Sequence, residues 1–385
     1  MKIVSIFGTR PEAIKMAPVI REIERRPKIE HVVVATGQHR EMLDQAMDGF
    51  EIVPDHDLRL MAVSGGLGDL AGNALKGLSD VLVLESPDLV LVQGDTATTL
   101  AGALAAYYLR IPLGHVEAGL RTGDLARPWP EEGNRKLVGG LATLHFAPTE
   151  GNGANLQAEG VPRERIWVTG NTVIDALFWM RRRIAAVPPW RKASSAAKAT
   201  KRNRLLVTTH RRENFGARLR DIWAALMVIA DRGDCEIVYP LHLNPSLAAA
   251  ARTLRDASAV KLVPPLDYAR FLQLLEQADL ILTDSGGLQE EATALGRPVL
   301  LMRDVTERPE AVAAGIVRLV GTETERIVMA VDELLSDPKA LKAMNHPSAV
   351  FGDGRAAKRI VDAIEEWFKR EENYSRLPRA THRPE

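Results

Sequence analysis

The sequence has little of several features that mark particular protein classes. It contains a single cysteine, Cys235, which excludes an intramolecular disulfide and a metal site built from several cysteines. No apolar run approaches the ~20 residues of a membrane span. Basic and acidic residues balance at 50 each, so the formal net charge is zero. That balance argues against nucleic acid or a membrane surface as a partner held by bulk charge.

Other absences narrow the expectation further. The chain opens directly into an apolar, β-branched stretch, without the architecture of a signal peptide. No H-x-x-x-H or C-x-x-C pattern suggests a metal site. We therefore expect a soluble, cytoplasmic protein that uses no metal. With 385 residues, of which 46% are hydrophobic, the chain can form two or three domains with substantial cores.

Short β-branched runs alternate with helical patterns along most of the chain, which is typical of βαβ units and a parallel sheet. The first array predicts strands over Lys2–Phe7, His31–Ala35, Leu89–Gln93, Leu113–Val116 and Leu144–Ala147. The second array follows a stretch low in large apolar residues, Pro188–Lys201, which we interpret as a linker. It predicts strands over Arg204–Thr208, Glu236–Tyr239, Val260–Val263, Leu280–Thr283, Val299–Met302 and Val317–Val320. This pattern predicts an α/β chain of two Rossmann-like domains that face each other across a cleft.

Three carboxylates are the strongest functional signal. Asp95 and Glu117 lie just past predicted strands, and Glu131 lies in Trp-Pro-Glu-Glu-Gly-Asn-Arg. Ligands of open parallel sheets bind at the carboxyl ends of strands, and acids at that edge favour proton-transfer chemistry. Each acid also has a simpler explanation. Asp95 would cap a helix that starts at Thr96, Glu117 would pair with Arg121, and Glu131 would lie on a surface loop.

Two strand ends carry features of an anion site. Thr9 and Glu12 have the spacing of a capping box at a helix start, and the free N–H groups there suit an anion, together with Arg10 and Lys15. The segment Thr283–Gly287 repeats the arrangement in the second array. Its simpler interpretation is a capping Ser285 with glycines that serve the turn.

Further residues suit a nucleotide ligand. Glu291, one turn into the helix after Gly287, could accept hydrogen bonds from a ribose. His210 and Arg211 follow the first strand of the second array, where they suit a diphosphate. His242 has a weaker case, and Arg308 is either a surface ion pair with a neighbouring glutamate or a ligand contact.

One apparent nucleotide motif is discounted. The segment Gly66–Ala71 matches the dinucleotide fingerprint G-x-G-x-x-A, but no convincing strand precedes it. We interpret it as a loop or a helix start.

Taken in order, these motifs make the chain resemble the non-hydrolysing bacterial UDP-N-acetylglucosamine 2-epimerases. The resemblance is carried by Phe7–Pro18, Gln38–Asp44, Gly94–Thr96, His115–Asp124, Pro130–Glu132, Gly170–Asp175, His210–Glu213, His242–Pro245, Asp284–Gly287, Thr306–Glu310 and Gly352–Gly354. It implies a glycosyltransferase-B-like fold with domains over residues 1–175 and 176–353. A linker at about 188–203 lies within the second domain, and a helix at about 354–370 packs back on the first.

The resemblance also implies an activity. Members interconvert UDP-N-acetylglucosamine (UDP-GlcNAc) and UDP-N-acetylmannosamine (UDP-ManNAc), without a cofactor, by eliminating UDP to give 2-acetamidoglucal and adding it back. The product supplies cell-surface polysaccharide. The family's catalytic residues fall on Asp95, Glu117, Glu131 and His210. Its UDP contacts fall on Arg10, Lys15, Phe271, Ser285, Gly286, Gly287, Glu291 and Arg308. Members are typically homodimers, and some bind a second UDP-GlcNAc as an activator, through motifs that hold His39, Arg211 and His242.

Rival interpretations stay open at this point. A hydrolysing relative would release free N-acetylmannosamine, and another epimerase would act on a modified sugar such as a uronic acid derivative. A glycosyltransferase with the same fold would need an acceptor. A UDP-sugar sensor without catalysis would leave the three acids without a purpose.

Overall fold

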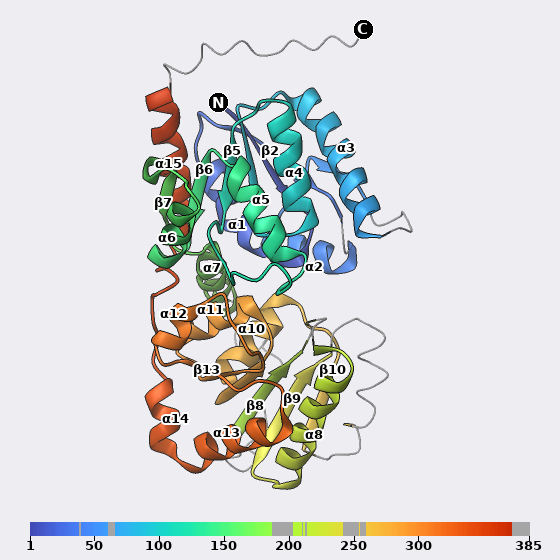
Figure 1. Cartoon of the computed structure of the whole chain (residues 1–385), viewed down its shortest axis with the longest axis vertical. Coiled ribbons are helices and arrows are strands. Elements are labelled where there is room, and N and C mark those ends of the chain that lie inside the picture. The colour runs from blue at the N-terminus through green and yellow to red at the C-terminus, as the bar shows by residue number, and fades with distance from the viewer. Residues whose placement is uncertain are drawn as a thin grey trace. The chain divides into compact units, whose positions relative to one another are not determined.

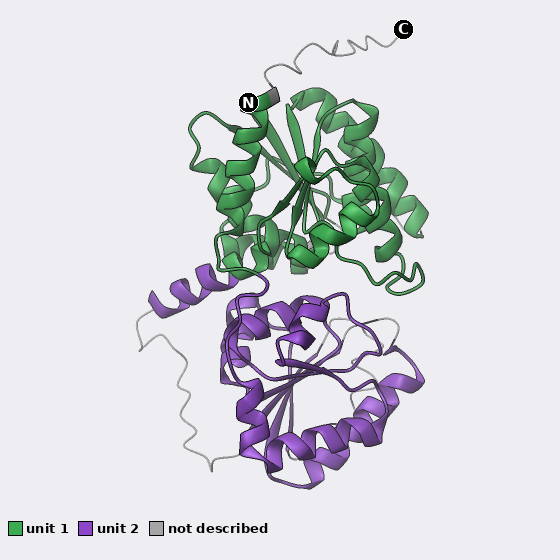
Figure 2. Cartoon of the chain, turned by 60° about the vertical axis from the view of Figure 1, so that its left-hand side comes forward, with its two compact units in different colours: residues 1–176, 352–385 green, residues 177–351 purple. Residues whose placement is uncertain are grey.

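The computed structural model describes residues 1–37, 40–60, 66–186, 203–209, 211, 214–241, 254 and 259–371. The chain divides into two compact units (Figure 2). Unit 1 comprises residues 1–176 and 352–385, and unit 2 comprises residues 177–351. Within the described ranges, each unit is built on one parallel sheet with helices on both faces (Figure 1). The chain therefore leaves unit 1 once and returns to it once.

The sheet of unit 1 has seven strands in the order β3-β2-β1-β4-β5-β6-β7. The strands are β1 (Lys2–Phe7), β2 (Glu30–Ala35), β3 (His56–Asp57), β4 (Leu89–Gln93), β5 (Leu113–Val116), β6 (Leu144–Ala147) and β7 (Ile166–Val168). The helices are α1 (Arg10–Glu24), α2 (Arg40–Phe50), α3 (Leu67–Glu85), α4 (Ala97–Tyr108), α5 (Glu131–Leu141), α6 (Glu150–Ala158) and α15 (Ala356–Glu371). A further helix, α7 (Thr172–Ala186), begins in unit 1 and continues into unit 2. The five strands predicted for this half are confirmed. The strands β3 and β7 were missed, because two or three residues are too short to form a pattern.

Helices cover the sheet of unit 1 in two layers. On one face α3, α4 and α5 contact one another in turn, and their apolar side chains pack with those of β1 and β4. The chain runs from β1 to β2 and β3 in one direction across the sheet, and from β4 to β5 and β6 in the other. Because βαβ connections are right-handed, α1 and α2 lie on the other face of the sheet. There α1 also contacts α15. All residues of β4 are buried, which explains why its sequence is an unbroken apolar run that ends in Gln93.

The helix α15 is anchored in unit 1 near its middle and at its start. Near its middle, Asp362 and Glu365 accept hydrogen bonds from the Arg26 guanidinium at 2.7 and 3.4 Å. At its start, the Asp175 carboxylate accepts the backbone N–H groups of Ala356 and Ala357 at 3.1 and 3.0 Å. Asp175 lies in the first turn of α7, so one side chain joins the segment that leaves unit 1 to the segment that returns.

The sheet of unit 2 has six strands in the order β10-β9-β8-β11-β12-β13. The strands are β8 (Asn203–Thr208), β9 (Cys235–Pro240), β10 (Val260–Val263), β11 (Leu280–Thr283), β12 (Val299–Leu301) and β13 (Val317–Leu319). The helices are α8 (Ala217–Asp231), α10 (Tyr268–Gln277), α11 (Gly286–Leu295), α12 (Pro309–Ala313), α13 (Thr324–Ser336) and α14 (Pro338–Met344). All six predicted strands are confirmed to within one residue at each end. The core lies between the sheet, α8 and α13, and Cys235 is buried in it.

Two other expectations have clear outcomes. Gly66 is the N-cap of α3, so the fingerprint-like segment is a helix start, as interpreted. No helix in the described ranges is long and apolar enough to cross a membrane. The predicted linker at about 188–203 lies outside the described residues, apart from its last position.

Candidate active site

The predicted acids of unit 1 lie where the strand order of its sheet reverses. The reversal falls between β1 and β4, and open parallel sheets bind ligands at such a switch point, beyond the carboxyl ends of the strands. Thr9 and Arg10 follow β1, Asp95 follows β4, and Glu117 follows the neighbouring β5. Residues that are far apart in the sequence therefore belong to one edge of the sheet.

Glu117 is a buried carboxylate held by two partners. Its Oε2 accepts the Lys15 ammonium at 2.5 Å and the Asn171 side-chain amide at 2.7 Å. Its backbone has φ 67°, a left-handed conformation that costs a residue with a side chain about 1–2 kcal/mol. Such strain is typical of functional positions. The simpler explanation, a pair with Arg121, is wrong, because Arg121 forms a two-point ion pair with Glu159 at 2.9 and 2.6 Å.

Asp95 is held by the buried guanidinium of Arg135. The Arg135 Nε and Nη2 atoms lie 2.8 and 2.6 Å from Asp95 Oδ2, and the Asn134 amide donates to the Asp95 carbonyl at 2.8 Å. Both partners come from α5. Asp95 does not cap the next helix as its simpler explanation required, because the N-cap of α4 is Thr96, whose hydroxyl accepts the Thr99 N–H.

The two adjacent glutamates that begin α5 have different environments. Glu132 is fully buried, where it accepts hydrogen bonds from Arg135 at 2.9 Å and from the N–H groups of Thr122 and Gly123 at 3.0 Å each. Glu131 is half-buried, and no hydrogen bond or ion pair joins its carboxylate to any residue that the structure describes. Because α5 begins at Glu131, the assignment of this residue to a surface loop is wrong.

Two buried residues that the sequence interpretation missed lie beside these acids. The Glu12 carboxylate accepts four hydrogen bonds, and burial raises its pKa. The His115 imidazole, in β5, donates from Nε2 to the Gly94 carbonyl at 2.7 Å. Burial lowers the pKa of His115 to about 4, so the ring is neutral. The capping-box spacing identified Glu12 as part of a helix start, but nothing in the sequence signalled its contacts with the next loop.

Unit 2 has its own switch point, between β8 and β11. The helix α11 starts directly after β11 with Ser285 as N-cap, whose hydroxyl accepts the Leu288 N–H at 3.4 Å, as the simpler interpretation expected. A β-carbon at Gly286 would lie 2.8 Å from Arg308 Nη1 and 3.0 Å from Glu307 Oε1. Glycine is needed there because these charged side chains pack directly against the start of the helix.

Arg308 is the centre of a buried group of charges. Its guanidinium contacts Glu290 of α11 and lies 3.0 Å from Glu307, which also accepts the Arg303 guanidinium at 2.8 Å. Arg211 reaches the same Glu307 at 3.4 Å. The ion pair with the neighbouring Glu307 exists, but Arg308 is 3% exposed, so the interpretation of this pair as a surface feature is wrong. Three guanidinium groups and the carboxylates of Glu290, Glu307 and Asp284 therefore lie at the start of α11, so positive and negative charges are equal in number.

Two further predicted residues lie in the same half. The Glu291 carboxylate accepts the Tyr268 hydroxyl at 2.6 Å. Tyr268 begins α10, and Phe271 follows it by one helical turn. Tyr268 was not predicted, and the sequence contains no motif that would have indicated it. The Asp284 carboxylate accepts the Arg211 N–H and the Asn214 side-chain amide, each at 3.0 Å, and so fixes the chain after β8.

The family model described as UDP-N-acetylglucosamine 2-epimerase matches residues 21–365, most of the chain. The chain belongs to the UDP-N-acetylglucosamine 2-epimerase family. The enzyme of that name from Yersinia pestis is 51% identical over 369 residues, which cover 94% of this chain and 98% of the relative. The family is one of isomerases, so the chain is an enzyme of that class.

Solved structures of the family agree with the fold. The Neisseria meningitidis UDP-GlcNAc 2-epimerase bound to UDP-GlcNAc is 44% identical, with a TM-score of 0.92 over 95% of this chain and 100% of that one. The Methanocaldococcus jannaschii enzyme in complex with UDP-GlcNAc and UDP is 35% identical, with a TM-score of 0.82 over 95% of this chain and 100% of that one. The predicted glycosyltransferase-B-like class, an α/β chain with two parallel sheets, is confirmed.

Three predicted residues of this epimerase-family chain cannot be placed. His39, His210 and His242 lie outside the described residues. Their roles stay predictions.

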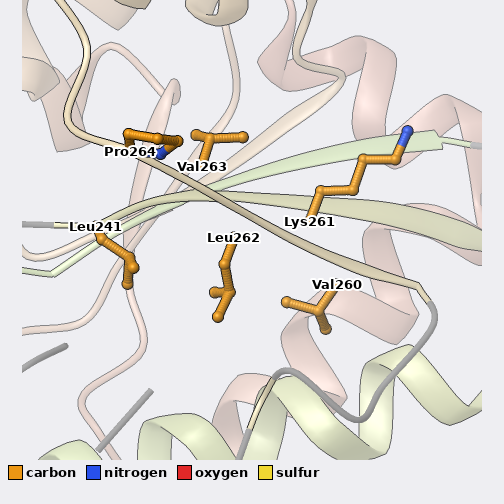
Figure 3. A pocket seen from close by; sticks show the side chains of 6 residues that line it. All are labelled: Leu241, Val260, Lys261, Leu262, Val263 and Pro264. Atoms are coloured by element: carbon orange, nitrogen blue, oxygen red, sulfur yellow. The ribbon is translucent and has the colours of Figure 1, made fainter. Parts of the chain in front are cut away.

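A depression in unit 2 lies along β10 and does not coincide with the candidate residues. It is lined by Leu241, Val260, Lys261, Leu262, Val263 and Pro264 (Figure 3). Val260 and Leu262 point to one side of the strand and Lys261 to the other, as the alternation of a strand requires. Lys261 is the one charged group of this lining, and it pairs with Glu236. The depression therefore has neither the acids nor the guanidinium groups of the candidate site.

Proposed function

We propose that this protein interconverts UDP-GlcNAc and UDP-ManNAc by inverting the configuration at C2 of the sugar. The observation that carries the proposal is the setting of three acids at one sheet edge. Asp95 is held by Arg135, Glu117 is held by Lys15, and Glu131 has no partner among the described residues. Membership of the family and the UDP-GlcNAc bound to the Neisseria enzyme support this substrate.

The proposed reaction is an elimination followed by an addition. A carboxylate takes the C2 proton, the electrons of the C2–H bond form the C1=C2 double bond, and the C1–O electrons leave with UDP. The C2–H bond of an acetamido sugar is not acidic enough for simple deprotonation, so early breaking of the C1–O bond makes the proton removable. Proton delivery to the other face of 2-acetamidoglucal and return of UDP to C1 give the epimer. No cofactor takes part in these steps.

We assign proton transfer to Asp95, Glu117 and Glu131. Glu131 precedes Arg135 by four positions in α5, so both lie on one face of that helix, and Arg135 contacts Asp95. This spacing supports Glu131 and Asp95 as neighbours in the reaction. Ion pairs with Arg135 and Lys15 hold the carboxylates of Asp95 and Glu117 in fixed positions.

We assign the binding of UDP to cations and helix starts. The departing diphosphate would be stabilised by Arg10, by His210, by Arg308 and by the start of α11, through the Ser285 hydroxyl and the N–H groups of Gly286 and Gly287. The Ser285 N–H itself donates to the Thr283 hydroxyl at 3.0 Å. Glu291, held by Tyr268, would bind the ribose, and Phe271 would lie near the uracil.

Lys15 is a special case among the proposed UDP contacts. It contacts Glu117, so we infer that its first role is to hold that carboxylate.

We also propose an oligomeric state, an activator and a use for the product. A homodimer would cover the exposed apolar side chains at the ends of α3 and α4, Val83, Leu84, Tyr107 and Tyr108. A second UDP-GlcNAc would act as an activator near His39, Arg211 and His242. The enzyme would act in the cytoplasm, and its product would supply ManNAc units for cell-surface polysaccharide.

Proton NMR of the purified protein with UDP-GlcNAc alone in D₂O tests the proposal. We expect UDP-ManNAc to appear with deuterium at C2 in both sugars. Epimerisation without deuterium uptake would refute the elimination, and free ManNAc as the main product would indicate a hydrolase. A requirement for an acceptor would indicate a glycosyltransferase, and turnover only of a modified UDP-sugar would indicate a different epimerase.

Two amide variants test the assigned acids. Asp95→Asn and Glu117→Gln should abolish exchange at C2 while UDP still binds. Glu159→Gln is the matched control, because Glu159 is also paired with an arginine of unit 1 but lies outside the proposed site. Undiminished exchange in both site variants would remove these acids from the reaction.

A further inference from the structure

Glu12 connects two loops that carry proposed catalytic and binding residues. Its Oε2 accepts the N–H groups of Gly8 and Thr9 at 2.8 Å each, in the loop after β1. Its Oε1 accepts the hydroxyls of Thr96 and Thr99 at 2.5 and 3.0 Å, at the start of α4 after β4. One carboxylate therefore joins the two chain segments that meet at the switch point of unit 1.

The Glu12 carboxylate is buried among neutral donors. Glu12 is 2% exposed, and each of its four donors is neutral. Glu117 and Glu132 of the same unit each have a cationic partner, whereas Asp175 is held by neutral N–H groups as Glu12 is. Burying a carboxylate costs free energy unless hydrogen bonds compensate it, so loss of the bonds to either loop would destabilise the folded state. Burial also raises the pKa of Glu12, although the hydrogen bonds oppose this.

The packing around Glu12 leaves these loops little freedom. Thr98, in the same first turn of α4, shares a hydrogen bond with Thr36 after β2 at 2.8 Å. A β-carbon at Gly8 would lie 2.1 Å from the Thr36 hydroxyl and 2.3 Å from the Thr98 hydroxyl. The ends of β2, β1 and β4 are therefore fixed to one another by direct contacts between polar side chains and a glycine.

The residues next to these contacts are those with proposed roles. Arg10 follows Thr9, and Asp95 precedes Thr96. We propose that Glu12 is a positioning residue of the epimerisation, which sets the distance between the loop of Arg10 and the loop of Asp95. The inference rests on the proposed function, because it concerns the geometry of that reaction. Glu12 itself touches no substrate in this proposal.

Threonine variants test the inference with a matched control. Thr96→Val removes the hydroxyl that contacts Glu12 and also the N-cap of α4. Thr149→Val removes an equivalent N-cap from α6, where the hydroxyl accepts the Asn152 N–H, but has no contact with Glu12. Both variants should lower the melting temperature by similar amounts. Only Thr96→Val should lower kcat, by ~10- to 100-fold, with little change in KM, because small misplacements of reacting groups have effects of this size.

Two further variants separate positioning from stability. Thr96→Ser restores the hydroxyl and should return kcat to near the wild-type value. Glu12→Gln keeps the shape but replaces one acceptor oxygen by a donor, and should lower kcat as Thr96→Val does. Equal kcat values in Thr96→Val and Thr149→Val, or no recovery in Thr96→Ser, would overturn the inference alone if the wild type epimerises. A wild type without epimerase activity would overturn both the proposed function and this inference.

Discussion

Replacing Asp175 by asparagine should remove a pH dependence from the free energy of unfolding. Asp175 joins the start of α7 to the start of α15 through the N–H groups of Ala356 and Ala357. Burial raises the pKa of Asp175 to about 6 from an ordinary value of 3.8, and the negative charge of Asp353 adds to the rise. The two N–H groups act in the opposite direction. The folded protein therefore binds this proton more tightly than the unfolded chain does.

The sign and size of the effect follow from proton linkage. The contribution of Asp175 to stability is fully present below pH 3.8 and is lost as the pH rises through about 6. A tenfold change in proton affinity is worth about 1.4 kcal/mol, so the contribution of Asp175 amounts to about 3 kcal/mol. The buried histidines His31, His115 and His145 have lowered pKa values and act with the opposite sign below their ordinary value of 6.5. The wild-type profile alone would therefore mix both effects.

The difference between wild type and Asp175→Asn isolates the effect. Urea unfolding followed by circular dichroism at several pH values between about 4 and 7 should show this difference falling by about 3 kcal/mol as the pH rises. Asp337→Asn is the control, because Asp337 also accepts a backbone N–H at a helix start, that of Lys339 in α14, but is exposed. Its difference from wild type should not follow this course. A constant difference for Asp175→Asn would refute the reasoning.

Three further predictions concern named contacts. Arg135→Gln should lower kcat by ~10- to 100-fold, the value of a lost charged hydrogen bond, whereas Arg121→Gln, which breaks the pair with Glu159, should not. Equal effects of the two arginine variants on kcat would count against a role for Arg135 at Asp95. Tyr268→Phe should weaken the binding of UDP by ~10-fold in calorimetry but leave the binding of pyrophosphate unchanged, because the hydroxyl holds the proposed ribose ligand Glu291. A loss of both affinities would show a general disturbance of unit 2. In His115→Gln, the fall in the free energy of unfolding between about pH 6.5 and 4 should be about 3 kcal/mol smaller than in the wild type, because burial lowers the pKa of His115 to about 4. Urea unfolding at both pH values measures this difference.

The positions of Asp95 and Glu117 could be predicted from the sequence because the apolar run of each preceding strand has a clear end. The runs before Asp95 and Glu117 are fully buried strands, β4 and β5, and in each case the first acidic residue follows the end of the strand within two positions. The partners of these acids could not be predicted. Lys15 is 102 positions from Glu117 and Arg135 is 40 positions from Asp95, and only the fold brings them together.

The same limit applies within single motifs. Glu131 and Glu132 are adjacent, and no sequence rule decides which of two neighbouring acids faces the core. The helix α5 begins at Glu131, which turns Glu132 towards Thr122 and Arg135. Likewise, the spacing of Thr9 and Glu12 indicated a helix start but not the second loop that Glu12 contacts. Local spacing specifies contacts within one helix turn, whereas contacts between loops depend on strand order.

Asp95 and Glu131 differ in their partners, and this difference matters for a reaction that runs in both directions. The group that removes the C2 proton in one direction must return it in the other, so the acid on each face must exist in both protonation states. Arginine does not lose its proton, so Arg135 stays charged beside Asp95 in every step. Glu131 has no such partner in the described structure, so no ion pair fixes the position of its carboxylate. Substitutions of Arg135 should thus slow both directions by the same factor and leave the final ratio of UDP-GlcNAc to UDP-ManNAc unchanged, since a catalyst cannot alter an equilibrium. A variant that changed this ratio would indicate that one sugar is removed by a second reaction, which the proposed function does not contain.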